Sequence, residues 1–416
     1  MLLISEYATS FVIPIIILLA LTVIPSILIT VLKIRFLPII VGQIIVGLII
    51  ARWFNTYIID GGYESFIAGI NIISLVMLMF ISGYDVDFDV FKDLVVYYDL
   101  VEPKKINVFK KSLLMVGLIY LSSAIAATAI NYFFGNKQFW GFILLTIVFA
   151  STFAGMVVPI LHEERSNNSV LGKIISTIAN LSEAITIIAL TILMIILDTN
   201  RNYIIIFILL VVLLVLYLLI RHVKVGKVFE KIPEGIDHLI TRVIIIALLS
   251  IVFLSDCAGG EYILGAFFFG IFVRNTGFSK KVNSSLSRIV FGVFAPLFFV
   301  LVGTQIDILS FFQEDSNIWL LIVLFFTFLV VELPVLFLLK WYRINAVISV
   351  IFIVSCTIIA QIAARHIGLE YNLFNESFAD ALVLSGLLVS IIGGIIYRIQ
   401  SPFRGYHNLE DKDDYE

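Results

Sequence analysis

Apolar residues fill the chain in long blocks, and short polar or charged stretches separate one block from the next. Each block is roughly 20 residues long, the length that a helix needs to cross ~30 Å of hydrocarbon. Only helices and closed barrels satisfy their backbone groups in lipid, and the alternation typical of a barrel is absent. The pattern therefore predicts an all-α polytopic membrane protein. About thirteen spans are predicted, at 8–32, 37–54, 65–84, 108–134, 138–162, 170–197, 202–221, 238–255, 259–275, 284–306, 316–341, 344–366 and 377–399.

The composition strengthens this prediction, since 61% of the residues are hydrophobic, 14% are charged and the mean hydropathy is +1.10. A soluble domain is roughly half apolar and about a quarter charged. The first block lacks the basic start and the small-residue cleavage site of a signal peptide, so we expect it to be retained. Cys257 and Cys356 are too few for a disulfide framework and match no zinc or redox spacing, so we interpret them as packing residues.

The distribution of lysine and arginine predicts the orientation. If the N-terminus is outside, about 23 of the 27 basic residues fall on the inner side of the membrane, as the positive-inside rule requires. We therefore expect a multi-pass protein of the cell (plasma) membrane with a cytoplasmic C-terminus and a short cytoplasmic tail at 401–416. The longest interior loop, about 85–107, is too short to be a soluble domain. The four exceptions are Arg52, Lys137, Arg201 and Arg365.

Two pairs of segments indicate an internal repeat. LPIIVGQIIVGLIIAR (37–52) resembles EYILGAFFFGIFVRN (261–275), and LMFISGYDVD (78–87) resembles FFVLVGTQID (298–307). The second pair leaves the membrane on opposite sides in the predicted orientation, so the copies have opposite topology, as in many secondary transporters. Spans 1–6 and 8–13 would be the repeats, with span 7 (202–221) as the linker. Chance similarity between apolar helices is the alternative.

Two spans carry an ionisable residue near the middle, Glu183 in span 6 and Glu332 in span 11. An acid buried in a membrane costs several kcal/mol and is a functional candidate by default. The alternative for each is a structural acid, protonated and hydrogen-bonded between helices. Asn180 lies one turn before Glu183, and Ser182 is adjacent to it, so both supply neutral oxygens suited to a hard monovalent cation. A carboxylate in such a site holds a proton and a cation in turn, which is sufficient for exchange.

Spans 5 and 12, which occupy corresponding repeat positions, are predicted to be interrupted. Pro and Gly weaken a helix, and transporters build ion sites from helices broken at mid-membrane. Span 12 has no interior Gly or Pro, and for both spans ordinary packing of small residues is the alternative. The candidate residues are Ser151, Thr152, Gly155 and Pro159 in span 5, and Ser355, Thr357 and Gln361 in span 12. We expect Ser151 and Thr152 to join the cation and proton site.

From about residue 10 to 400 the sequence resembles the monovalent cation:proton antiporter superfamily. The resemblance is to the branch that holds bacterial Na+/H+ exchangers and the Kef potassium efflux systems, and PLFFVLVGTQID (296–307) is its strongest element. LPIIVGQIIVGLII resembles an early family helix, with Gln43 in the place of the usual Glu. STFAGMVVPILHEER followed by LGKIIS resembles the family's broken helix and the start of its ion-binding helix.

The resemblance implies one membrane transporter domain over 1–400, with a scaffold that dimerises and a core that moves. The core would contain the helices at about 138–197 and 316–399, with spans 5 and 12 as two crossed, unwound helices. It also implies Na+ or K+ and H+ as the transported ions and a homodimer in membrane lipid.

Two positions depart from the family pattern. Counting on from LGK, the family's paired Asp-Asp, Asn-Asp or Gln-Asp motif aligns with Ser182 and Glu183. Glu183 therefore keeps the carboxylate of the family's second Asp, on a side chain that is one methylene longer. Because Ser182 carries no charge, we expect electroneutral, one-for-one exchange at Glu183. The family's Lys or Arg in span 11 falls on Glu332. This acid is then protonated at rest, or it acts as a gate or a second proton or cation carrier.

The sequence thus predicts a secondary antiporter, not an enzyme, that exchanges Na+ or K+ for H+ by alternating access. The altered Ser-Glu pair leaves an alternative, a divergent member that acts as a uniporter, a sensor or an assembly subunit. No paired mid-span Asp or His-rich motif of an intramembrane protease appears. No phosphate loop, dinucleotide fingerprint or nucleic-acid patch appears either, so we expect no cofactor, resident metal or nucleic-acid partner.

Overall fold

The fold is a bundle of membrane-length helices. A computed structural model describes residues 12–34, 36–85, 94–98, 103–135, 137–164, 166, 169–197, 237–257, 262–275, 280–305, 318–339 and 344–400. Within these residues nine helices are long and apolar enough to span a membrane, and a helix pair bent by 42° adds one broken span. Two shorter apolar helices complete the set, at Leu239–Leu254 and Gly265–Arg274. The predicted fold class is therefore confirmed, with a helix in each predicted span except 202–221, which lies outside the described residues.

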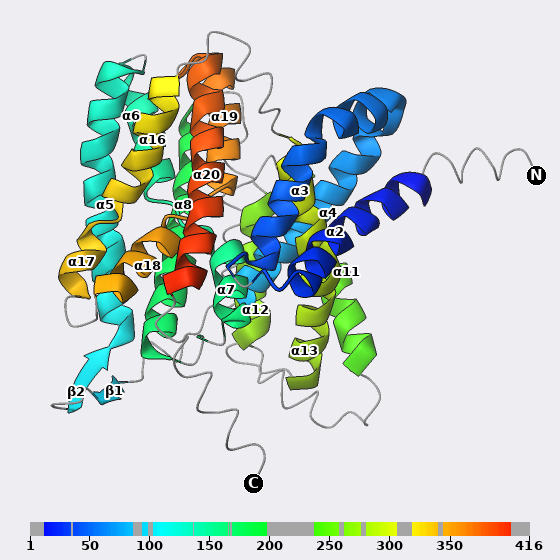
Figure 1. The fold of residues 1–416 in the computed structure, drawn as a ribbon, viewed down its shortest axis with the longest axis horizontal. Helices are drawn as coiled ribbons and strands as arrows, with labels where there is room; N and C mark the ends of the chain where they lie inside the picture. The colour runs from blue at the N-terminus through cyan, green and yellow to red at the C-terminus, as the bar shows by residue number, and fades with distance from the viewer. Residues whose placement is uncertain are drawn as a thin grey trace, which may run out of the picture. The chain divides into compact units, whose positions relative to one another are not determined.

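The chain divides into two compact units, and the first comprises Met1–Lys33, Gly42–Val86 and Ile195–Ile308. Its helix α4 packs against both α12 and α14. Two π-helical segments, η2 and η4, interrupt the regular spans, and the sequence did not predict them. The elements of unit 1 are α2 (Ile13–Val31), most of α3 (Ile39–Phe54), η2 (Asn55–Tyr63), α4 (Glu64–Tyr84), α11 (Asp237–Cys257), α12 (Tyr262–Asn275), α13 (Lys280–Ile289), η4 (Val290–Phe294) and α14 (Ala295–Thr304) (Figure 1).

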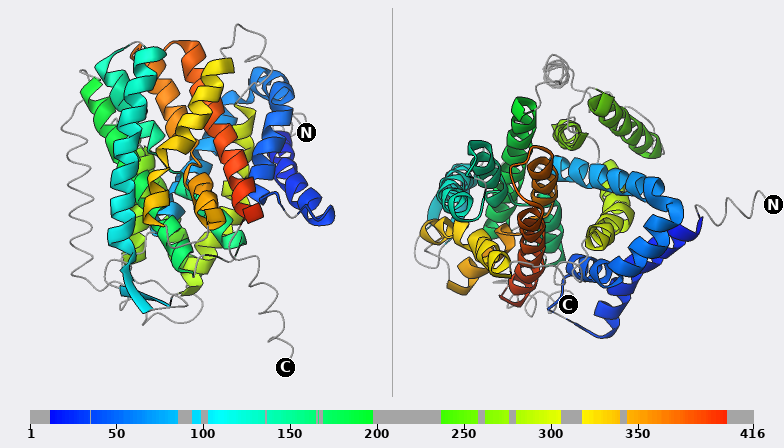
Figure 2. Two further views of the ribbon diagram at one scale, coloured as in Figure 1. Left: turned by 60° about the vertical axis from the view of Figure 1, so that its left-hand side comes forward. Right: turned by 90° about the horizontal axis from the view of Figure 1, so that it is seen from above.

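Unit 2 comprises Ile34–Val41, Asp87–Met194 and Leu309–Glu416. Its helix α20 packs against α16, α18 and α19, and α5 packs against α6, α16 and α17 (Figure 2). The elements are β1 (Leu94–Tyr98), β2 (Pro103–Asn107), α5 (Val108–Phe133), α6 (Phe139–Phe149), α7 (Ala154–Glu163), α8 (Val170–Leu197), α16 (Ile318–Val331), α17 (Pro334–Leu338), α18 (Ile344–Val354), α19 (Ile359–Glu370) and α20 (Glu376–Gln400).

The stretch predicted as the longest interior loop contains a β-hairpin. Strands β1 and β2 pair antiparallel, with Leu94 opposite Asn107 and Tyr98 opposite Pro103. The hairpin leads directly into α5, as the ribbon shows (Figure 1). The 401–416 tail lies outside the described residues.

Glycines bring α3 and α14 of unit 1 into backbone contact. A Cβ atom on Gly47 would lie 2.2 Å from the carbonyl oxygen of Val300. A Cβ atom on Gly303 would lie 2.4 Å from the carbonyl oxygen of Ile44. No other residue fits such spacings, because each is far shorter than a van der Waals contact.

The same arrangement recurs between α12 and α4 of unit 1. A Cβ atom on Gly270 would lie 2.0 Å from the carbonyl oxygen of Phe80, and one on Gly83 would lie 2.0 Å from that of Phe267. In the sequence repeat α12 corresponds to α3, and the end of α4 corresponds to the end of α14. The crossing of α3 with α14 in one repeat therefore corresponds to the crossing of α12 with α4 in the other, as two repeats related by an internal two-fold axis require.

Candidate functional site

Span 5 of unit 2 stops being helical for four residues. Helix α6 ends at Phe149 and α7 begins at Ala154, with Phe153 in an extended conformation between them. Pro159 has no N–H, so it leaves the carbonyl of Gly155 without its helical partner, and both residues favour an interruption nearby. This agrees with the interruption that the sequence predicts for span 5.

Span 12 is interrupted in the same way, although its interior has neither Gly nor Pro. Helix α18 ends at Val354, α19 begins at Ile359, and the two are bent by 42°. Ser390 of α20 stabilises the gap, because its hydroxyl accepts from the N–H of Thr357 and donates to the carbonyl of the same residue, both at 2.9 Å. These tertiary hydrogen bonds replace the two that Thr357 would make in a continuous helix.

The two interruptions meet each other inside unit 2. The N–H of Phe153 donates to the carbonyl of Cys356 at 2.8 Å. The hydroxyls of Ser151 and Thr357 lie 2.6 Å apart. Gln361 donates to the Thr357 hydroxyl at 3.0 Å and is fully buried. The structure therefore brings together Ser151, Thr357 and Gln361, as the crossed-helix prediction requires.

Glu183 lies on α8 beside the first interruption, and it is 5% exposed. The adjacent Ser182 donates its hydroxyl to the carbonyl of Ala150, the first residue after α6. This bond fixes the Glu183 turn of α8 against the gap that contains Ser151 and Thr152.

Two neutral oxygens of this region have no hydrogen-bond partner among the described residues. They are Oγ1 of Thr152 and Oδ1 of Asn180, and both residues are buried. A buried oxygen without a partner costs about 1–3 kcal/mol, so its retention calls for a reason such as a bound ion. Hard cations take oxygen ligands, and carboxylate, amide and hydroxyl oxygens are the donor types present here. These are the donor types that a site for a desolvated cation requires.

Glu332 lies at a third interruption, between α16 and α17, and it is 1% exposed. Neither of its carboxylate oxygens has a partner within the part of the chain that the structure describes. Pro334 begins α17, and the Ser122 hydroxyl of α5 donates to the carbonyl of Val331 at 2.6 Å. Sequence reasoning found the acid but not the break that carries it.

Phe328, one helical turn before Glu332, links that turn to both interrupted spans. Its ring packs edge-to-face on Phe149, the last residue of α6, with centroids 5.1 Å apart. Its carbonyl accepts from the hydroxyl of Ser355 at 3.4 Å, in the gap of span 12. Glu332 directly follows the end of α16, so the break that carries it lies next to a helical turn that contacts both interrupted spans.

Sequence reasoning missed Ser390, Ser122 and Tyr120, which support the site. The hydroxyl of Tyr120 on α5 lies 3.0 Å from that of Thr186, three residues after Glu183. The available signal was weak, because serine and threonine in an apolar helix usually bond to their own backbone.

The chain is similar to transport proteins over most of its length. A family model described as "Sodium/hydrogen exchanger, transmembrane" matches residues 16–399. A Bacillus subtilis (strain 168) protein named "Putative Na(+)/H(+) antiporter YjbQ" is 29% identical over 366 residues, which cover 87% of this chain and 59% of that protein. The chain thus spans less than two thirds of the length of this relative. A Methanocaldococcus jannaschii protein named "Probable Na(+)/H(+) antiporter 3" is 26% identical over 337 residues, 78% of this chain and 81% of that one.

The fold is also that of a solved structure, titled as the sodium proton antiporter MjNhaP1 from Methanocaldococcus jannaschii at pH 8. The TM-score is 0.63 over 94% of this chain and 97% of that one. Sequence identity is 14%, so the match establishes a shared architecture.

Proposed function

Because the chain belongs to the sodium/hydrogen exchanger family, we propose that it exchanges Na+ for H+ across the cell membrane by alternating access. The observation that carries the proposal is Glu183, a buried carboxylate fixed by Ser182 against the gap of a broken helix. The names of the relatives support Na+ as the cation, and the assay below includes K+ as the other candidate.

The exchange rests on one carboxylate that holds either ion. With a proton bound, Glu183 is neutral and needs no counter-ion. When the proton leaves, the carboxylate binds the cation, and we propose that Asn180 and Thr152 add neutral oxygens, with Ser151 and Ser182 beside them. Because the two ions compete for one group, neither crosses without the other crossing back.

We further propose that unit 2 is the moving core and that unit 1 is the scaffold, through which two copies form a homodimer in the membrane. The crossed interruptions of spans 5 and 12 lie in unit 2, and so do the buried acids Glu183 and Glu332, as a core that carries the ions would require. The basic residues support an outside N-terminus and a cytoplasmic C-terminus.

The test is a pH-gradient assay in proteoliposomes with Na+, K+ and Li+ added separately. We expect Na+ to dissipate the gradient in the wild type and Glu183→Gln to abolish the effect, because the amide binds neither a proton nor a cation. Glu370→Gln is the matched control, since Glu370 ends α19 and, in the described part of the chain, its carboxylate lies 3.7 Å from His366. A gradient that no cation dissipates, or full activity in Glu183→Gln, would overturn the proposal. The first result would favour a sensor or assembly subunit.

A further inference from the structure

Residues 34–41 connect the two units in an unusual way. The chain leaves unit 1 after Lys33, belongs to unit 2 for Ile34–Val41, and returns to unit 1 at Gly42. Lys33 has a φ of 50°, in the left-handed region that non-glycine residues rarely adopt. A movement of one unit against the other must be accommodated in or beside this connector, and Lys33 at its start is the non-helical point. What holds the connector to unit 2 therefore decides where the bending occurs.

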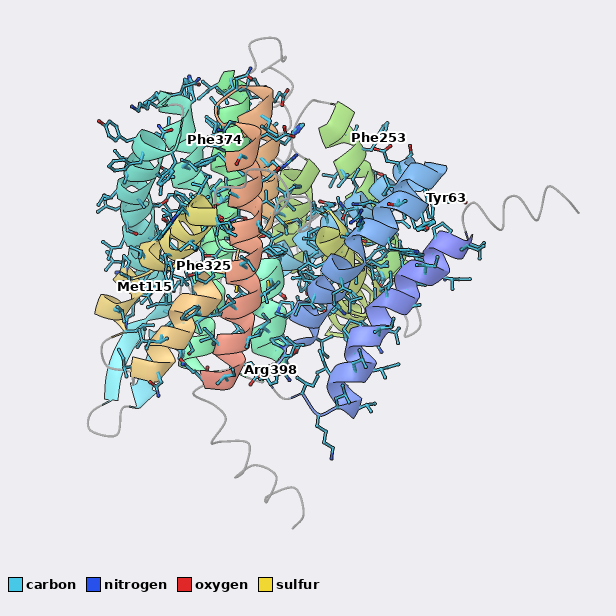
Figure 3. All side chains as sticks on the ribbon, turned by 45° about the horizontal axis from the view of Figure 1, so that its top comes forward. Tyr63, Met115, Phe253, Phe325, Phe374 and Arg398 are labelled. Atoms are coloured by element: carbon cyan, nitrogen blue, oxygen red, sulfur yellow. The ribbon has the colours of Figure 1, made fainter. Side chains whose placement is uncertain are left out.

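Arg398, in the last turn of α20, makes that attachment (Figure 3). Its Nη1 donates to the carbonyl of Leu37 at 2.8 Å and to Oε2 of Glu163 at 3.1 Å. Its Nε lies 3.0 Å from Oε1 of Glu164. One guanidinium thus joins the connector, the end of α7 and the end of α20. The Arg398 side chain is 20% exposed, so these charge-assisted bonds are partly shielded from water.

Glu163 makes a second contact to the connector. Its Oε2 also accepts from the N–H of Ile39, the first residue of α3, at 3.4 Å. The first turn of α3 contains no acidic residue of its own, so Glu163 supplies the negative charge that a helix N-terminus favours. At the C-terminal end of its own helix α7 the same charge is unfavourable. The position of Glu163 is therefore explained by the connector and Arg398, and not by the stability of α7.

A layer of apolar contacts lies one turn below Arg398. Gly394 of α20 faces the connector and α7, since a Cβ atom there would lie 2.9 Å from Val41, 3.4 Å from Ile160 and 3.6 Å from Pro38. The connector, α7 and α20 meet again at this level. Two successive turns of α20 therefore contact the same two partners, the connector and α7.

The attachment point is linked directly to the exchange site. Helix α7 begins at Ala154, immediately after the gap that contains Ser151 and Thr152, and it ends at Glu163. This helix is ten residues long and buried along most of its length. A displacement of the gap is thus transmitted along α7 to Glu163, Glu164 and the connector.

We propose that Arg398 is a positioning residue for exchange, which fastens the connector to the half-helix α7 through Glu163 and Glu164. With the fastening intact, residues 34–41 move together with the exchange site of unit 2, and the chain bends where the connector begins, at Lys33. Without it the connector no longer follows α7, and part of the movement of the exchange site is taken up inside residues 34–41. The transport consequence rests on the proposed exchange function, whereas the attachment itself does not.

Hydrogen exchange of the full chain in lipid nanodiscs, measured by mass spectrometry, tests the attachment. We expect Arg398→Gln to speed amide exchange in 34–41 about tenfold, because it removes charge-assisted bonds to Leu37 and Glu163. Arg365→Gln is the matched control, since it removes a single ion pair of unit 2, to Asp380 at 2.6 Å, without touching the connector. Unchanged protection of 34–41 in Arg398→Gln would overturn the proposal.

Transport kinetics test the consequence. In Arg398→Gln we expect the maximal Na+-driven rate to fall about tenfold and the KM for Na+ to stay within about twofold, since Glu183 and its oxygens are unaltered. If Arg398→Gln folds poorly, the double variant Glu163→Gln/Glu164→Gln should likewise lower the maximal rate about tenfold and leave the KM for Na+ within about twofold. A wild-type rate, or a raised KM at an unchanged rate, would contradict the proposal. A wild type that does not exchange Na+ would instead overturn the proposed function, and the hydrogen-exchange result would still decide the attachment.

Discussion

At the scale of single residues, Ser390 carries an unusual share of the architecture. Its one hydroxyl accepts a hydrogen bond from the N–H of Thr357 and donates one to the carbonyl of Thr357. These two bonds take the place of the backbone bonds that a continuous helix would provide. Thr357 in turn contacts Ser151 across the crossing. Without these bonds the gap in span 12 would leave buried polar groups unpaired, and an apolar helix without Gly or Pro would be expected to close over it.

We predict that Ser390→Ala lowers the free energy of unfolding by about 1–3 kcal/mol and slows exchange, because two buried backbone groups lose their partner. Thermal unfolding in detergent and the pH-gradient assay measure the two effects. Ser385→Ala is the control, since among the described residues that buried hydroxyl donates to the carbonyl of Leu382 in its own helix. A stability equal to that of the control would show that Thr357 does not need Ser390.

Glu332 poses the opposite case, a buried acid whose oxygens have no partner in the described part of the chain. We propose that it serves exchange as a second acid beside the crossing, with a gating role. Glu332→Met should then raise the thermal unfolding midpoint, since it removes an unpartnered polar group worth about 1–3 kcal/mol, and it should slow exchange. A structural acid would give a lower midpoint. Glu332→Gln, which keeps the shape, separates the loss of the acid from a change in packing.

At the scale of elements, a close glycine-mediated crossing holds α4 against α12 in unit 1. We predict that Gly83→Ala destabilises the protein strongly, because its methyl group would lie 2.0 Å from the Phe267 carbonyl and push α4 away from α12. Gly69→Ala on the same helix has open space and should gain up to about 1 kcal/mol from helix propensity. Thermal unfolding of the two variants decides the point. Equal stabilities would contradict the glycine-mediated crossing.

At the scale of the whole molecule, we predict that exchange moves no net charge. Ser182 is neutral, so Glu183 alone alternates between one proton and one monovalent cation. Imposing a membrane potential on proteoliposomes should therefore leave the Na+-driven rate unchanged. A rate that rises with an inside-negative potential, together with a measurable transport current, would contradict one-for-one exchange.

Much of the fold was predictable because a bilayer allows so few structures. Lipid forces each apolar block of sufficient length into a helix, so the spans followed from hydropathy. The polar residues Glu183, Asn180, Ser151 and Thr152 stood out for the same reason, since each interrupts an apolar stretch. The hairpin at 94–107, the π-helical segments and the break beside Glu332 were not predicted, because local sequence does not distinguish them from a loop or a straight helix.

The sequence by itself determined which segments cross the membrane, that Glu183 and Glu332 lie inside their spans and which family motifs are present, because these depend on local polarity and spacing. Only the tertiary structure decided that Ser390 would stabilise an interruption in a helix without Gly or Pro, and that Arg398 would reach residues more than two hundred positions away. Such contacts depend on which helices become neighbours. That choice is made by packing over the whole chain, so no window of sequence contains it.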